Sequence, residues 1–260
     1  MIVTFGNFKG GVGKTTATTL FTYLLSKQYK VLAIDTDPQA NLTESIARSY
    51  KYEFEPDLNI YNALFSDEPI TNHIQTVHDN LDVLSGTWDM VNFEITAPNF
   101  YYKKDYKRIL KLSIEDIKND YDYILIDTAP ATNLVMDNVI SATDYVVITT
   151  KTEPLSYDST QKFYSYLLDR YNDRDYNFEL LGVLPYLVGK SATDRDMLIK
   201  YGEIFDIEIF ENRIRQSDRV KSWSMYGITE DEAYDQRTLK MYEKVVDEAV
   251  QRIEKTRSWL

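Results

Sequence analysis

The chain has 260 residues, enough for one large α/β domain with an ample hydrophobic core. It contains no cysteine, which excludes disulfides, thiolate metal sites and cysteine-ligated iron–sulfur clusters. The formal net charge of −12 argues against a basic surface over the whole molecule, so contact with nucleic acid would need a local patch. We expect a single domain over residues 1–260, with no N-terminal helix-turn-helix domain, no leader and no membrane span.

The first predicted elements are a short strand, a glycine loop and a helix. The strand is the apolar run from Ile2 to Phe5, and the helix runs from Ala17 to Gln28. The loop between them reads Lys9-Gly10-Gly11-Val12-Gly13-Lys14-Thr15-Thr16. Backbone N–H groups in such a loop surround a polyphosphate, Lys14 can reach its β- and γ-phosphates, and the Thr15 hydroxyl can bind Mg²⁺. The helix N-terminus that follows adds affinity for anions.

Two later apolar runs lead into aspartates. The run from Lys30 to Asp35 continues into Asp37, and the run from Tyr123 closes on Asp127. Because ligands of an α/β sheet bind at the carboxyl ends of its strands, both Asp37 and Asp127 should lie beside the glycine loop. An aspartate at such a strand end holds the Mg²⁺ of phosphate-loop NTPases, usually through water.

The remaining pattern alternates between strands and helices. Further strands are predicted at 81–86, 145–150 and 180–185, and helices at 101–120 and 238–255. Residues 44–80 carry mixed turn and helix signals, and we expect the two histidines there, His73 and His78, to be solvated. The apolar stripe of the last helix indicates docking on the core. The alternation predicts an α/β fold with one doubly wound, mostly parallel sheet flanked by helices.

The glycine loop also departs from the ordinary phosphate-loop pattern, because Phe8 stands where glycine is expected and Lys9 adds a second lysine. This arrangement resembles the deviant Walker A motif of the ParA/MinD superfamily, K-G-G-x-G-K-T-T. The runs around Asp37 and Asp127 are similar to that family's D-x-D-P-Q-x-N-x-T and D-x-[AP]-P motifs. The resemblance covers most of the chain and is strongest over residues 2–43 and 123–130.

The resemblance implies a phosphate-loop ATPase that binds ATP and Mg²⁺, with Thr15, Asp37 and Asp127 at the metal. It implies that Lys9, Lys14, Asp37 and Asp127 serve catalysis. In the family the first lysine, here Lys9, reaches across a dimer interface to the partner's nucleotide. The aspartate equivalent to Asp37 positions or activates the attacking water.

Among the family's members, the ParA/Soj-type partition ATPases are the most similar. They imply a homodimer when ATP is bound, non-specific DNA binding, a ParB-like or other site-binding partner that stimulates hydrolysis, and plasmid or chromosome partition. Such a protein would be cytoplasmic and nucleoid-associated, with no membrane partner. The candidate DNA contacts are four cations in the segment similar to the family's arginine run: Arg213, Arg215, Arg219 and Lys221. The alternative for these four is surface ion pairing with Glu208, Glu211 and the acidic residues 230–232.

The sequence leaves open other functions for a protein with this glycine loop. A MinD-like, membrane-associated positioning ATPase would need a C-terminal amphipathic helix with bulky apolar residues, where this chain offers Trp259 and Leu260. A protein-tyrosine kinase is suggested only by the 21 tyrosines, which are scattered along the chain. An electron-transfer or metal-carrier relative would need the bridging cysteines that the chain lacks.

Overall fold

The computed structural model describes residues 1–173 and 176–258. Within them lies a seven-stranded sheet of order β3-β4-β2-β5-β1-β6-β7. Its pairs are parallel except β3–β4, which is antiparallel. The strands are β1 Ile2–Gly6, β2 Val31–Asp35, β3 Gln75–His78, β4 Leu81–Leu84, β5 Tyr123–Asp127, β6 Tyr145–Thr150 and β7 Glu179–Pro185. The predicted doubly wound, mostly parallel sheet is therefore confirmed.

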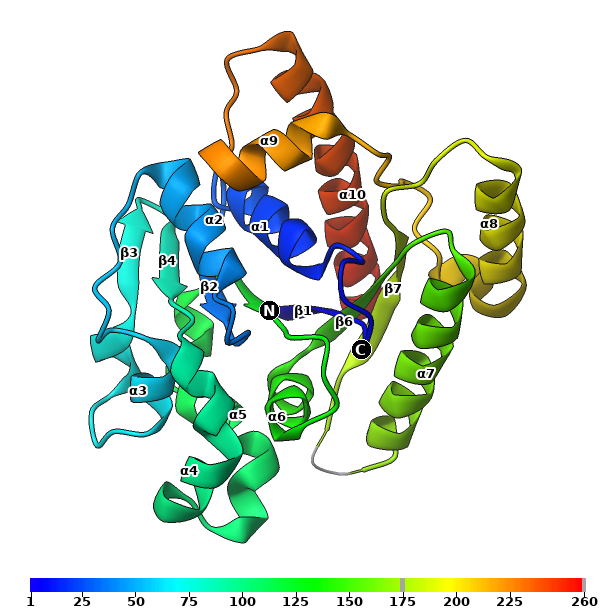
Figure 1. Cartoon of the computed structure of the whole chain (residues 1–260). Coiled ribbons are helices and arrows are strands. Elements are labelled where there is room, and N and C mark those ends of the chain that lie inside the picture. Colours follow the sequence, from blue (N-terminus) through cyan, green and yellow to red (C-terminus); the bar gives the residue numbers. More distant parts are fainter. Residues whose placement is uncertain (174–175, 259–260) are drawn as a thin grey trace.

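Helices cover both faces of this sheet (Figure 1). Alternate residues of a strand point to opposite faces, so Val31 and Ala33 of β2 pack with the helices α1, α2, α9 and α10. Leu32 and Ile34 of β2 pack on the other side, where helices α3 to α8 lie over the sheet. The helices are α1 Lys14–Leu25, α2 Asn41–Tyr50, α3 Ile60–Leu64, α4 Phe93–Phe100, α5 Ile109–Ile114, α6 Leu134–Ala142, α7 Pro154–Tyr171, α8 Ala192–Phe205, α9 Asp218–Tyr226 and α10 Ala233–Arg257.

The strand order places one crevice at the middle of the sheet. β1 lies between β5 and β6, with β2, β4 and β3 beyond β5 on one side and β7 beyond β6 on the other. Asp35 and Asp127 pair directly across β2 and β5 at their carboxyl ends. Ligands of such sheets bind outside the carboxyl ends of the strands where the winding direction changes. The loops after β1, β2, β5 and β6 meet at this edge.

Two features of residues 70–120 differ from the prediction. His73 is only 5% exposed, so the expectation that both histidines are solvated is wrong for His73. The single helix expected at 101–120 is instead the 3₁₀ turn Lys103–Arg108, α5 and the 3₁₀ turn Lys118–Asp120. Asn138 of α6 interrupts the helical pattern at the junction, because its amide donates to the Tyr106 carbonyl (2.6 Å) and accepts the Leu110 N–H (3.2 Å).

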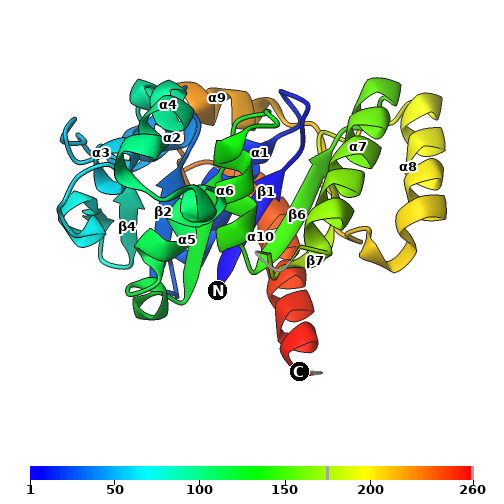
Figure 2. The same cartoon turned by 90° about the horizontal axis from the view of Figure 1, so that it is seen from below.

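The last helix docks on the core as predicted. Its buried stripe includes Tyr242, Val245, Ala249 and Ile253. The carboxyl end of α10 projects past the rest of the molecule (Figure 2). Trp259 and Leu260, considered above as a membrane contact, lie outside the described residues. In the part of the chain that the structure describes, no helix is both long and apolar enough to span a bilayer.

Candidate functional site

The glycine loop between β1 and α1 adopts backbone angles that require glycine. Gly11 has φ +72° and Gly13 has φ +93°, in the left-handed region that side chains disfavour. A Cβ on Gly13 would also lie 2.4 Å from the ring of Tyr186, so the residue has no room for a side chain. Lys14 then begins α1, which places the loop directly before a helix N-terminus. This is the strand, loop and helix arrangement of an anion site.

Lys14 lies inside this loop and is 6% exposed. Its Nζ donates to the Lys9 carbonyl at 3.2 Å. Burial lowers the pKa of Lys14, while the carboxylates of Asp127 and Asp37 act in the opposite direction. The side chain is therefore a partly desolvated cation aimed into the loop, where a phosphate would compensate for the lost hydration.

Asp35, at the end of β2, organises the adjacent segment. Its Oδ2 accepts the Thr43 N–H (2.9 Å) and hydroxyl (2.8 Å), and its Oδ1 accepts the Asp37 N–H (3.2 Å). A Cβ on Gly86 would lie 2.8 Å from the Asp35 carboxyl carbon, so glycine is needed there. Burial raises the pKa of Asp35 to about 6, although the Thr43 bonds oppose this shift. Asp35 is thus a fully enclosed anchor for the segment that carries Asp37.

Asp127, at the end of β5, is fully buried and only half satisfied. Its Oδ1 accepts the Thr18 hydroxyl at 3.4 Å, while its Oδ2 has no hydrogen-bond partner among the described residues. Burial raises the pKa of Asp127 well above its usual range, and the nearby carboxylates of Asp35 and Asp37 raise it further. The nearby Thr15 side chain and the charge of Lys14 lower the pKa and so act in the opposite direction. A buried carboxylate oxygen without a partner is the kind of group that a divalent cation or its water satisfies.

Asp37 lies nearer the surface of the same edge, with 8% of its area exposed. Its Oδ1 accepts the Gln39 N–H at 2.9 Å. Within the described residues, no group of three or more His, Cys, Asp or Glu side chains could hold a metal by itself. A magnesium ion here would therefore take few protein ligands, as Mg²⁺ does when phosphates and water supply the others.

Lys9 is tied to the first turn of α7. Its Nζ forms an ion pair of 2.9 Å with Oε1 of Glu153, the N-cap residue of that helix. Its backbone N–H donates to Oδ1 of Asn7 at 3.0 Å. Asn7 is fully buried and donates in turn to the Thr149 carbonyl (2.8 Å) and the Thr160 hydroxyl (3.1 Å). Both backbone and side chain of Lys9 are therefore positioned by β6 and α7.

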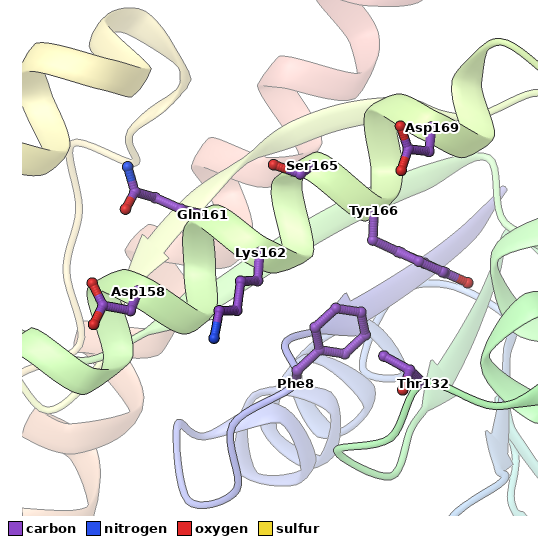
Figure 3. A pocket seen from close by; sticks show the side chains of 8 residues that line it. All are labelled: Phe8, Thr132, Asp158, Gln161, Lys162, Ser165, Tyr166 and Asp169. Atoms are coloured by element: carbon purple, nitrogen blue, oxygen red, sulfur yellow. The ribbon is translucent and has the colours of Figure 1, made fainter.

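The ring of Phe8 forms a second contact between the glycine loop and α7, in addition to the ion pair of Lys9. The ring packs edge-on against Phe163 and Tyr166, with centroids 4.9 and 5.3 Å apart. Figure 3 shows Phe8 below α7, with Thr132 beside it and Asp158 and Lys162 on the helix above. These residues line a pocket of about 680 Å³. The side chain that replaces the usual glycine thus acts as a packing contact between the loop and α7.

The four candidate DNA contacts lie in different settings. Arg219 forms ion pairs with the buried Asp235 and with Glu232, and Lys221 pairs with Asp218 at 3.4 Å. Arg213 and Arg215 are exposed and line a groove of about 1120 Å³. The described residues that line this basic groove include six cations and one carboxylate: Lys190, Arg213, Arg215, Arg237, Lys240, Lys244 and Glu211.

The structure brings Lys9, Lys14, Thr15, Asp37 and Asp127 to one edge of the sheet, and it adds residues that the sequence analysis missed. These are Asp35, Asn7 and Glu153 around the loop, and the groove cations Lys190, Arg237, Lys240 and Lys244. The sequence did contain an indication that Glu153 lies at the site, because this residue follows the carboxyl end of β6 as Asp37 follows that of β2.

Comparison with known proteins identifies a matching family and several relatives of this chain. Residues 1–179 match the family AAA_31, described as an AAA domain. The chain is 34% identical over 155 residues to the sporulation initiation inhibitor protein Soj of Bacillus subtilis, which covers 58% of each chain. It is 32% identical over 149 residues to the chromosome partitioning protein ParA of Myxococcus xanthus, covering 56% of this chain and 50% of that protein. The match thus spans about half of these relatives' length.

Solved structures share the fold over nearly the whole chain. A plasmid partition protein of Borrelia burgdorferi B31 bound to AMPPNP superposes with a TM-score of 0.80 at 25% identity, covering 96% of this chain and 98% of that one. The ATP complex of a McdA variant from Cyanothece superposes with a TM-score of 0.83 at 21% identity, covering 96% of each chain. The chain therefore belongs to the AAA_31 family of AAA domains, as the ParA/Soj-type member that its sequence motifs predict.

Proposed function

We propose that this protein is a Mg²⁺-dependent ATPase that dimerises on ATP, binds DNA non-specifically and drives plasmid or chromosome partition. The observation that carries the proposal is the glycine loop, where two left-handed glycines and the buried Lys14 face the carboxylates of Asp37 and Asp127. An ammonium group and a carboxylate pair at the start of a helix fit a polyphosphate together with its metal.

The residues present fit ATP and Mg²⁺. Lys14 would hold the β- and γ-phosphates, and Thr15 and Asp127 would hold the ion, since the free Oδ2 of Asp127 needs a partner. When bound, Mg²⁺ would neutralise charge on the phosphates. Asp37, less deeply enclosed than Asp35 and Asp127, is the carboxylate able to orient the attacking water.

Lys9 would act between subunits rather than on its own nucleotide. Its side chain is 27% exposed and leaves the loop toward Glu153, whereas Lys14 is enclosed. Two lysines that leave one loop in different directions can serve two nucleotides, as the family resemblance implies. Dimer formation would then depend on ATP in both subunits.

The basic groove would supply the contact with DNA. Its six cations are concentrated on a protein whose net charge is −12, which supports a localised phosphate-binding surface despite the acidic composition. Two copies in an ATP-bound dimer would double the number of phosphate contacts and raise the affinity steeply. A ParB-like or other site-binding partner would supply sequence specificity and stimulate hydrolysis.

Electrophoretic retardation of arbitrary DNA tests the proposal directly. The purified protein with Mg²⁺ and ATP should retard DNA of unrelated sequences, and the same protein with ADP should not. Lys14→Ala should lose ATP binding in a calorimeter together with retardation, because the loop loses its buried cation. Wild-type ATP affinity in Lys14→Ala, or equal retardation with and without ATP, would show that the proposed function is wrong.

A further inference from the structure

Lys151 is the first residue after β6, and its ammonium group reaches the glycine loop. A Cβ on Gly11 would lie 4.0 Å from Nζ of Lys151, which is the nearest side-chain atom to that point. The position of the residue is fixed at its backbone, since the Lys151 carbonyl accepts the hydroxyl of the fully buried Tyr201 at 3.1 Å. The side chain is half-buried. The loop thus faces a third lysine that none of the recognised motifs contains.

The three lysines differ in their partners. Lys14 donates to the Lys9 carbonyl, and Lys9 is paired with Glu153. In the described part of the chain, the ammonium group of Lys151 has neither a carboxylate within 4.0 Å nor a hydrogen-bond acceptor. Like charges gathered around one loop repel each other, and an anion between them removes that cost. An unpaired ammonium over Gly11 is therefore placed for a ligand rather than for the fold.

We propose that Lys151 is a third phosphate-binding residue, which contacts the terminal phosphate of the nucleotide from the β6 side of the loop. The inference rests on the proposed function, because it assumes that a nucleoside triphosphate occupies the loop. Gly11 precedes the first residue of α1 by three positions, so Lys151 meets a bound polyphosphate at a different place from the helix N-terminus. Lys151 would then recognise the triphosphate over the diphosphate.

Glu153 explains why this role falls to Lys151 and not to Lys9. Glu153 holds the ammonium group of Lys9 at 2.9 Å and leaves that of Lys151 free. Lys9 and Lys151 both help to lower the pKa of Glu153, so both cations lie close enough to this carboxylate to act on it. With Lys9 engaged by Glu153, Lys151 is the half-buried cation available to the same subunit's nucleotide.

Binding of AMPPNP and of ADP, each with Mg²⁺, to Lys151→Met and Lys151→Arg tests this role by calorimetry. Lys151→Met should bind AMPPNP about tenfold more weakly than wild type, the size expected for one charge-assisted hydrogen bond, and bind ADP within about twofold. Lys151→Arg should retain most of the AMPPNP affinity, because it keeps the charge. Lys255→Met, which removes an exposed lysine from the carboxyl end of α10, is the matched control and should leave both affinities unchanged.

The outcomes separate this inference from the proposed function. If wild type binds neither nucleotide, the proposed function fails. If wild type binds AMPPNP and Lys151→Met binds it equally well, only the role of Lys151 is wrong. An equal loss of AMPPNP and ADP affinity in Lys151→Met, with unchanged thermal unfolding, would also overturn the assignment to the terminal phosphate.

Discussion

The neighbouring carboxylates of Asp35, Asp37 and Asp127 lie in three different environments. Asp35 is enclosed by hydrogen bonds from Thr43, and Asp127 is buried with one free oxygen, so neither is placed to orient a mobile water. We predict that Asp37→Asn binds ATP within about twofold of wild type and hydrolyses it about a hundredfold more slowly, a typical loss for a positioned catalytic group. Phosphate release and calorimetry measure the two effects.

The matched control for this change is Asp116→Asn, an exposed aspartate between α5 and β5. It should alter neither ATP binding nor phosphate release. Turnover at the wild-type rate in Asp37→Asn would move the catalytic role to another residue of the site or to a partner protein.

Lys9 gives a second prediction at the scale of the residue. Lys9→Ala should leave ATP binding by the monomer nearly intact, because we expect the enclosed Lys14 to bind the loop's own phosphates. It should weaken the ATP-dependent dimer at least tenfold, because a charged contact to the partner's nucleotide is lost. Analytical ultracentrifugation checks this, with Lys118→Ala, another ion-paired lysine, as control. An unchanged dimer would make Lys9 a local ion-pair residue only.

Sequence motifs indicated the candidate residues of the glycine loop and of the strand ends, but not the residues that position them. Lys14 and Asp127 follow from the order of strand, loop and carboxylate along the chain. The Lys9–Glu153 pair joins residues 144 positions apart, and the bond between Ile2 and Asp144 joins residues 142 apart. Such contacts depend on the placement of β6 next to β1, which no local pattern encodes.

At the scale of the element, Asp235 joins α9 to α10. This fully buried carboxylate accepts from Arg219, from Trp223 Nε1 (3.2 Å), from Thr229 (2.9 Å) and from the Glu232 N–H (3.1 Å). The Arg219 guanidinium, followed by the Glu232 and Thr229 hydrogen bonds, lowers the pKa of Asp235 to about 2. The folded protein therefore favours the ionised form more strongly than the unfolded chain does.

We predict that Asp235→Ala lowers the free energy of unfolding by about 3 kcal/mol, because it leaves Arg219 and three further donors without their acceptor. In wild type, the stability supplied by Asp235 is complete above pH about 4, the ordinary range of an aspartate. It is lost as the pH falls towards 2. Urea unfolding of both proteins from pH 2 to pH 7 should show two curves that converge in acid. A constant difference would assign the effect to packing alone.

Elements were predictable where a run is apolar almost throughout or carries a regular apolar stripe. The five-residue strands β2 and β5 are buried throughout, and α10 carries its apolar stripe over many turns. β3 was missed because only Gln75 of its four residues is buried and its pairing with β4 includes a register shift. The break in the helix between residues 108 and 109 was also not predicted, because it depends on the side chain of Asn138 from α6.

At the scale of the whole molecule, the contrast between the acidic overall charge and the basic groove bears on whether the protein can bind DNA. A net charge of −12 disfavours contact with DNA, whereas a groove lined by six cations is the kind of surface that would favour it. The fold creates this groove by bringing residues of the β7–α8 loop, the segment before α9 and α10 together, so the sequence showed only Arg213 and Arg215 of it. Arg219 lies in the structural link with Asp235 instead.

Salt dependence distinguishes a DNA-binding groove from a set of solvated cations. Each phosphate contact contributes about 0.9 to the slope of log K against log salt on duplex DNA, and a dimer uses each groove residue twice. Arg215→Ala should therefore weaken ATP-dependent DNA binding and reduce the slope by about two, without changing ATP affinity or the dimer. Lys118→Ala, remote in sequence and paired with Glu115, should leave the slope as in wild type. If Arg215→Ala keeps the wild-type slope, the groove does not bind DNA, and the basic segment Lys103–Arg108 becomes the surface to test.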